Sequence, residues 1–88
     1  IGAGTVVIDD EVCRPGWVHI DGRRIVACGT GAPSAPVDVA LPNSIVAPGF
    51  IDMHVHGGGG ASFGEAPVAA ARFHQRCGPT TTLASLVT

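Results

Sequence analysis

The sequence predicts an α/β fold in which a small β-rich region, residues 1–47, precedes the start of a strand–helix–strand unit in residues 48–88. Two observations carry this prediction. Short β-forming runs separated by turn residues fill the first half, and a strand of buried type, a helix and another strand follow Pro48. Of the 88 residues, 45% are hydrophobic and only 14% are charged. A disordered chain would carry more charge and fewer Val, Ile and Leu residues, so we expect a folded protein.

The first half should form a small antiparallel sheet. The dipeptide Asp21-Gly22 separates two β-forming runs, and Asp-Gly in this position is a strong hairpin signal because both central residues of the turn would have positive φ. A loop rich in Gly, Pro and Ser covers residues 29–36, and two further strands are expected around Pro42-Asn43. The expected strands are residues 5–9, 16–20, 23–28, 37–41 and 44–47.

The order of the predicted elements in the second half is that of a parallel βαβ unit. Residues 50–56 are apolar on both faces, as in a buried parallel strand. A helix is expected from Pro67 to Cys77, because Pro fits the first helical turn and Gly78 fits the position after the last one. Residues 80–88 then form the second strand. The helix should cover the first strand with an apolar stripe, which comprises Ala66, Ala70, Phe73 and Cys77 and would face Ile51, Met53 and Val55.

Charge, hydropathy and cysteine content exclude several classes of function. The chain has five Arg, no Lys and a net charge of −2, so we expect no nucleic-acid partner. No apolar run approaches the roughly 20 residues of a membrane-spanning helix, so we expect no membrane partner. Three widely spaced cysteines without a Cys-x-x-Cys pair favour reduced thiols in a cytoplasmic protein.

The two ends of the chain indicate a piece of a longer protein. Ile1 is not an initiator Met, and Thr88 falls inside a predicted strand with no stop signal after it. We therefore expect the chain to be the N-terminal part of a larger fold, and a site assembled from distant segments would be only partly present.

His54 and His56 are the candidate chemical groups. Alternation along a strand places both imidazoles on one face with Cα atoms about 6.5–7 Å apart, so they could bind one cation such as zinc. The same alternation brings Asp52 to this face as an outer partner of the ligands; the alternative is a strand-end cap. Gly57–Gly60 follow at the carboxyl end of the strand, where their N–H groups could line a substrate site; the alternative is a flexible loop.

A resemblance to a known family narrows this interpretation. Residues 48–57, Pro-Gly-Phe-Ile-Asp-Met-His-Val-His-Gly, resemble the signature that opens the catalytic barrel of the amidohydrolase superfamily. The hairpin of residues 18–29 resembles the small β-sandwich that flanks this barrel. Within the superfamily, the glycine run leading into residues 61–63 and the Thr-rich segment after Gly78 are most similar to the N-acetylglucosamine-6-phosphate deacetylase family.

The resemblance implies the N-terminal part of a metal-dependent hydrolase with a TIM-barrel fold and a flanking small β-sandwich. Residues 1–47 would supply strands of the β-sandwich, and residues 48–88 the first strand, helix and second strand of the (β/α)₈ barrel. His54 and His56 would bind one or two divalent ions per subunit, either zinc, iron or another metal. The substrate would be a small amino-sugar phosphate, and the full-length enzyme would be a homodimer.

The remaining ligands and a catalytic Asp would lie beyond Thr88, so the 88 residues alone are expected to be inactive. Two alternatives stay open at this point. One is another amidohydrolase, of the dihydroorotase, hydantoinase or amino-acid deacylase type. The other is a non-catalytic barrel homologue that serves as a scaffold, because a fold does not by itself fix a function.

Overall fold

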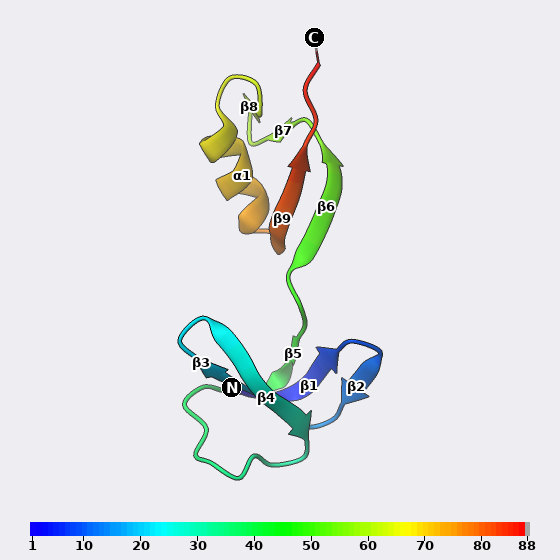
Figure 1. Ribbon diagram of the computed structural model, residues 1–88, viewed down its shortest axis with the longest axis vertical. Helices are drawn as coiled ribbons and strands as arrows, with labels where there is room; N and C mark the ends of the chain where they lie inside the picture. The colour runs from blue at the N-terminus through cyan, green and yellow to red at the C-terminus, as the bar shows by residue number, and fades with distance from the viewer. Residues whose placement is uncertain (88) are drawn as a thin grey trace. The chain divides into compact units, whose positions relative to one another are not determined.

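The computed structural model describes residues 1–87 and divides the chain into two compact units, Ile1–Pro48 and Gly49–Thr88 (Figure 1). Each unit has its own buried cluster. Ala3, Val6, Cys13 and Val18 form the core of the first unit, and Val55, Phe63 and Ala70 form the core of the second. In the described part of the chain, no helix is long and apolar enough to cross a membrane.

The first unit is a five-stranded sheet. Its strands are β1 (Gly2–Ile8), β2 (Glu11–Cys13), β3 (Gly16–Asp21), β4 (Arg24–Thr30) and β5 (Ala40–Val46). β1 is central, because it pairs with β2, β3 and β5, while β4 pairs with β3. The core lies around β1, whose Val6 is only 1% exposed. The short strand β2, which follows a turn with Asp9 at φ 47°, was not predicted from the sequence.

The predicted hairpin between β3 and β4 is confirmed, but its turn lies one residue further along the chain. Asp21 pairs with Arg24, so the two central residues are Gly22 and Arg23. Gly22, the first of them, has a φ of 60°. This is the arrangement of a type II′ turn, which needs a glycine at the first central position only. Asp21 therefore ends a strand instead of occupying the turn.

The two separate strands predicted around Pro42-Asn43 are wrong. One strand, β5, runs through this dipeptide and pairs parallel with β1, so the sheet is mixed and not purely antiparallel. Between the pairs Ala3–Leu41 and Thr5–Ile45, β1 has one residue and β5 has three. The resulting bulge accommodates Pro42, which has no N–H to donate to a neighbouring strand.

The second unit has the predicted strand–helix–strand order. Its elements are β6 (Phe50–Val55), β7 (Gly57–Gly58), β8 (Ala61–Ser62), α1 (Pro67–Gln75) and β9 (Pro79–Ala84). The parallel pairing of the first and second predicted strands is confirmed as β6 and β9. Pro67 starts α1, and Gly78 after it has a φ of 110°, as expected for a glycine that ends a helix. The predicted second strand reached Thr88; β9 ends at Ala84, and residue 88 lies outside the described residues.

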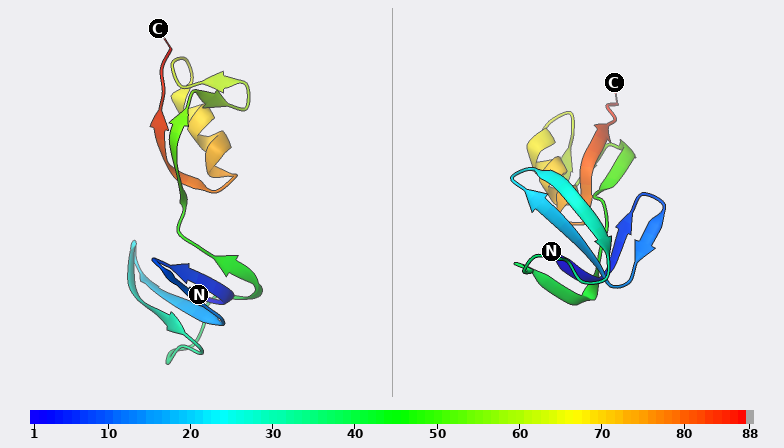
Figure 2. Two further views of the ribbon diagram at one scale, coloured as in Figure 1. Left: turned by 90° about the vertical axis from the view of Figure 1, so that its right-hand side faces the viewer. Right: turned by 60° about the horizontal axis from the view of Figure 1, so that its bottom comes forward.

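α1 lies beside β9 and the β7–β8 hairpin (Figure 2). Ala70 is fully buried there against Val55 and Phe63. The rest of the predicted helix–strand contact is not formed. Phe73 is 44% exposed, and Met53 of β6 is 74% exposed. The reason is local: the Phe73 ring packs over the glycine run instead of over the strand.

The glycine run forms a β-hairpin and not a flexible loop. β7 and β8 pair antiparallel, and Gly59 and Gly60 are the two residues of the turn. Their φ values are 62° and 82°. Positive φ at both positions defines a type I′ turn, whose twist matches that of the paired strands. Glycine is favoured at both positions because it adopts positive φ without steric cost.

We expect Gly4→Ala to destabilise the first unit. A Cβ at this position would lie 2.1 Å from the carbonyl oxygen of Pro42, a main-chain atom held in the β5 bulge. The free energy of unfolding should fall by about 2 kcal/mol, as for overpacking of a rigid site. Urea unfolding measures this change. Gly64→Ala is the matched control, because a Cβ there meets nothing within 4 Å, and an equal effect of the two variants would contradict the bulge geometry.

The turn glycines should respond differently to the same substitution. Gly60→Ala places a Cβ in open space, so only the positive φ opposes it, at a cost of about 1 kcal/mol. Gly59→Ala adds a steric conflict, because its Cβ would lie 2.6 Å from a carbon of the Phe73 ring. We expect Gly59→Ala to lower the free energy of unfolding by about 2–3 kcal/mol. Equal losses in urea unfolding would show that Phe73 does not pack on the turn.

Candidate metal centre

The structure brings His54 and His56 side by side. His54 is the fifth residue of β6, and His56 follows directly after its last residue, Val55. The centroids of the two imidazole rings are 4.9 Å apart, and the ring planes are nearly perpendicular at 88°. Both residues are exposed, whereas Val55 between them is buried in the core below. The pair therefore lies at the carboxyl end of a parallel strand with its rings open to a ligand.

A bulge in β6 determines the backbone conformation at His54. Asp52 pairs with Thr82 and Val55 pairs with Ala84, so two residues of β6 face one residue of β9. The N–H of His54 is turned to the side chain of Asp52 and donates to its Oδ1 at 3.2 Å. Asp52 thus accepts a hydrogen bond from the local backbone. In residues 1–87, Asp52 makes no hydrogen bond to either imidazole. No contact among these residues therefore supports its predicted role as an outer partner of the ligands.

Ser85 is the site residue that the sequence analysis missed. Its N–H donates to the carbonyl oxygen of Val55 at 2.9 Å. Its own carbonyl oxygen accepts from Nδ1 of His56 at 3.0 Å, and its Oγ lies 3.2 Å from Nδ1 of His54. A signal was present in the sequence. Ser85 directly follows the second parallel strand, and polar residues at the carboxyl ends of adjacent parallel strands converge on one site.

His74 holds the glycine hairpin next to the pair of imidazoles. Its Nε2–H donates to the carbonyl oxygen of Gly57 at 2.8 Å, and its ring stacks on Phe63 with an interplanar angle of 10°. Phe63 in turn donates its N–H to the carbonyl oxygen of His56 at 2.9 Å. A Cβ on Gly58 would lie 2.6 Å from Nε2 of His74. The backbone conformation and the close packing of residues 57–60 therefore already explain why glycine occurs there. A role of these residues in lining a substrate remains a prediction.

A hollow of about 380 Å³ adjoins His56. The residues that line it come from the hairpin side and from the segment after β9: His56, Ser62, Gly64, Ser85, Leu86 and Val87. The Oγ of Ser62 accepts the N–H of Glu65 at 3.2 Å, so this hydroxyl is oriented by the turn that precedes α1. One imidazole, two hydroxyls and the apolar side chains of Leu86 and Val87 line this hollow. Such a combination suits a small polar ligand.

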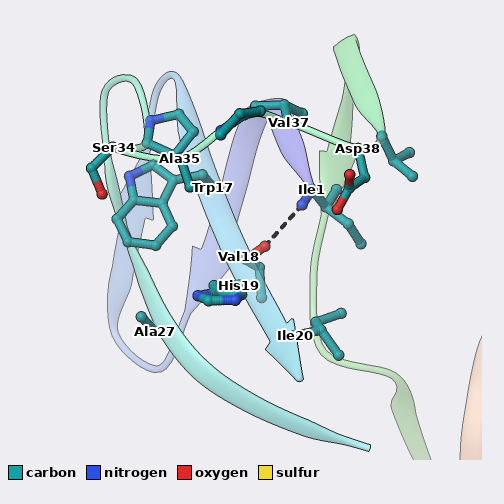
Figure 3. A pocket seen from close by; sticks show the side chains of 13 residues that line it. Ile1, Trp17, Val18, His19, Ile20, Ala27, Ser34, Ala35, Val37 and Asp38 are labelled. Carbon is teal, nitrogen blue, oxygen red and sulfur yellow. Dashed lines mark hydrogen bonds between the residues drawn. The ribbon is translucent and has the colours of Figure 1, made fainter. Parts of the chain in front are cut away.

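The first unit has a separate hollow of about 450 Å³ (Figure 3). Trp17, His19 and Asp38 line it together with mostly apolar side chains. Beside it, the amino group of Ile1 donates to the carbonyl oxygen of Val18 at 2.9 Å. His19 is the one imidazole among the residues that line this hollow. The imidazole that lines the hollow of the second unit, His56, has the ring of His54 4.9 Å away, so the pair in the second unit is the candidate for metal chemistry.

The donor set at His54 and His56 fits a divalent ion in part. Within residues 1–87, neither Nε2 atom has a hydrogen-bond partner, while both Nδ1 atoms are engaged by Ser85. Neutral imidazole with a free Nε2 is a common zinc ligand. The described residues contain no cluster of three or more His, Cys, Asp or Glu side chains that could hold a metal ion. The pair can therefore supply two ligands, and a stable site needs others from outside these residues.

No protein-family model matches the chain, but comparisons with individual proteins find similar ones. The N-acetylglucosamine-6-phosphate deacetylase of Bacillus subtilis is 33% identical over 91 residues, which cover 94% of this chain and 23% of that protein. The crystal structure of N-acetyl-D-glucosamine-6-phosphate deacetylase from Mycobacterium smegmatis is 46% identical with a TM-score of 0.93, and the match covers 98% of this chain and 26% of that one.

A mutant of the Mycobacterium smegmatis enzyme, solved in complex with N-acetyl-D-glucosamine-6-phosphate, gives a TM-score of 0.94 at 46% identity. The match covers 99% of this chain and 24% of that one. The chain thus spans about a quarter of the length of the relatives that it matches. Along nearly its whole length, it is similar to the N-terminal part of N-acetylglucosamine-6-phosphate deacetylases.

Proposed function

We propose that the chain is the N-terminal part of a metal-dependent N-acetylglucosamine-6-phosphate deacetylase. The observation that carries this proposal is the pair of exposed imidazoles, His54 and His56, with their rings 4.9 Å apart in a chain that is 46% identical to such an enzyme. In this proposal, residues 1–47 supply strands of a β-sandwich. Residues 48–88 supply the first strand, the helix and the second strand of a (β/α)₈ barrel, whose active site lies at the carboxyl ends of the strands.

The proposed reaction is hydrolysis of the 2-acetamido group. The bond between the amide carbon and nitrogen breaks, the oxygen of a water molecule joins the acetyl carbon, and protons pass to the nitrogen. The products are acetate and glucosamine 6-phosphate. A divalent ion, when bound, supplies polarisation of the amide carbonyl and activation of the water. His54 and His56 would hold zinc, or iron or another divalent metal, with one or two ions per subunit.

The chain's own residues prepare this site. Ser85 and the hydrogen bond from Phe63 to the carbonyl of His56 fix the second imidazole in place. The hollow beside His56 is the proposed position of the acetamido group, and the hairpin of Gly57–Gly60 is proposed as one of its walls. The resemblance to the deacetylases also supports a cytoplasmic homodimer as the state of the full-length enzyme.

The full-length protein should release acetate from N-acetylglucosamine 6-phosphate about 100-fold faster, in kcat/KM, than from N-acetylglucosamine. A site built to bind a charged group discriminates strongly against the analogue that lacks it. Acetate release with both substrates measures this ratio, and the 88 residues alone serve as an inactive control. Equal rates with the two sugars would contradict the phosphate-specific assignment and favour another amidohydrolase.

Removal of either imidazole should reduce both bound metal and turnover. We expect His54→Ala and His56→Ala to lower kcat/KM of the full-length protein by at least about 100-fold, because loss of a direct ligand costs more than the 10–100-fold typical of an outer partner. Metal content after dialysis gives a second readout. His19→Ala is the matched control, since His19 lines the hollow of the first unit. Full metal occupancy in both ligand variants would refute the proposed site.

A further inference from the structure

Ser85 makes contact with three consecutive residues of the other parallel strand. Its N–H reaches the carbonyl of Val55, its carbonyl reaches the ring of His56, and its hydroxyl reaches the ring of His54, all within 2.9–3.2 Å. The N–H, the carbonyl and the hydroxyl of Ser85 therefore all contact the segment that carries the candidate ligands. Ser85 is half-buried, and its backbone bond to Val55 continues the β6–β9 pairing by one residue beyond Ala84.

These contacts determine which nitrogen each ring offers to a ligand. A carbonyl oxygen can only accept a hydrogen bond, so the neutral ring of His56 must carry its proton on Nδ1 and keep a lone pair on Nε2. The hydroxyl of Ser85 can donate or accept at Nδ1 of His54. When Nε2 of His54 binds an ion, Nδ1 of the neutral ring carries the proton, and the hydroxyl is placed to accept it.

We propose that Ser85 is a positioning residue, which binds Nδ1 of both rings and thereby leaves Nε2 of both rings available to one metal centre. The inference rests on the proposed function, since it needs the two imidazoles to be ligands. Hydrogen-bonded outer partners fix the tautomer and the ring orientation of metal-binding histidines. Without such a partner, a ring that rotates about its Cβ–Cγ bond would place a carbon where the nitrogen is needed.

The side chain and the main chain of Ser85 can be separated by substitution. Ser85→Ala removes the contact to His54 but keeps the carbonyl that binds His56. Ser85→Thr keeps the hydroxyl as well. Ser62→Ala is the matched control, because Ser62 also lines the hollow but its hydroxyl serves the backbone of Glu65 and neither ring.

The first test uses NMR of the metal-free full-length protein with ¹⁵N-labelled histidine at alkaline pH. We expect the proton on Nδ1 of His56 in the unchanged protein, because its partner is a carbonyl oxygen that can only accept. In Ser85→Ala, the ¹⁵N chemical shift of Nδ1 of His54 should change because this atom loses its hydrogen-bond partner, while the proton on Nδ1 of His56 stays. Ser85→Thr and Ser62→Ala should leave both rings as they are. A proton on Nε2 of His56 in the unchanged protein, or an unchanged His54 in Ser85→Ala, would overturn the inference.

The second test is calorimetric titration of the same apoproteins with zinc. We expect Ser85→Ala to lower the zinc affinity about 10-fold, Ser85→Thr to restore it and Ser62→Ala to leave it unchanged. Unchanged affinity in Ser85→Ala overturns the role of Ser85, provided that His54→Ala and His56→Ala lower the affinity. Unchanged affinity in those two histidine variants refutes the metal site itself, and the inference fails together with it.

Discussion

The parallel pairing of β6 with β9 is the constraint on which the candidate site depends. It brings Ser85 within hydrogen-bond distance of His54, His56 and Val55, which lie 29–31 positions earlier in the chain. A parallel pair cannot be closed by a short hairpin and needs a crossover, which α1 and the glycine hairpin supply here. The crossover elements then pack back on the ends of the strands. The connection that makes the pairing possible therefore also shapes the surroundings of the imidazoles.

The glycine hairpin shows how a structural requirement can serve a site. Gly59 and Gly60 provide the positive φ values of the turn, and Gly57 and Gly58 allow the close approach of Ala61 and His74. His74 then binds the carbonyl next to His56. Because each glycine already has a structural reason, the run by itself is weak evidence for a phosphate or oxyanion site. Its relevance comes from its position, since an ordered hairpin leaves the segment after His56 little freedom to move.

Local pattern predicted the elements of the second unit well and its long-range contacts poorly. Apolar residues on both faces indicated the strand that leads to His56, and Pro67 with Gly78 bounded the helix to within two residues. The β6 bulge, the Ser85 contacts and the bond from His74 to Gly57 depend on register between segments that are distant in sequence, which a single sequence does not reveal. In the first unit, Pro42 and Asn43 have the composition of a turn. The bulge opposite Gly4 absorbs them, and one parallel strand results where two antiparallel strands were expected.

The exposed side of the second unit fits the proposed barrel. Parallel strands are generally covered on both faces, yet Ile51, Met53 and Leu83 of the β6–β9 pair are 69%, 74% and 65% exposed. A pair of strands also leaves backbone groups unpaired on its outer edges. A (β/α)₈ barrel would satisfy both needs, because further strands would pair with those edges and further helices and barrel side chains would cover the apolar residues. The same added strands would bring further ligands to the carboxyl ends of the strands. His54 and His56 would supply two of the three or four protein ligands that zinc requires. Completion of the sheet and completion of the metal centre are then one structural event.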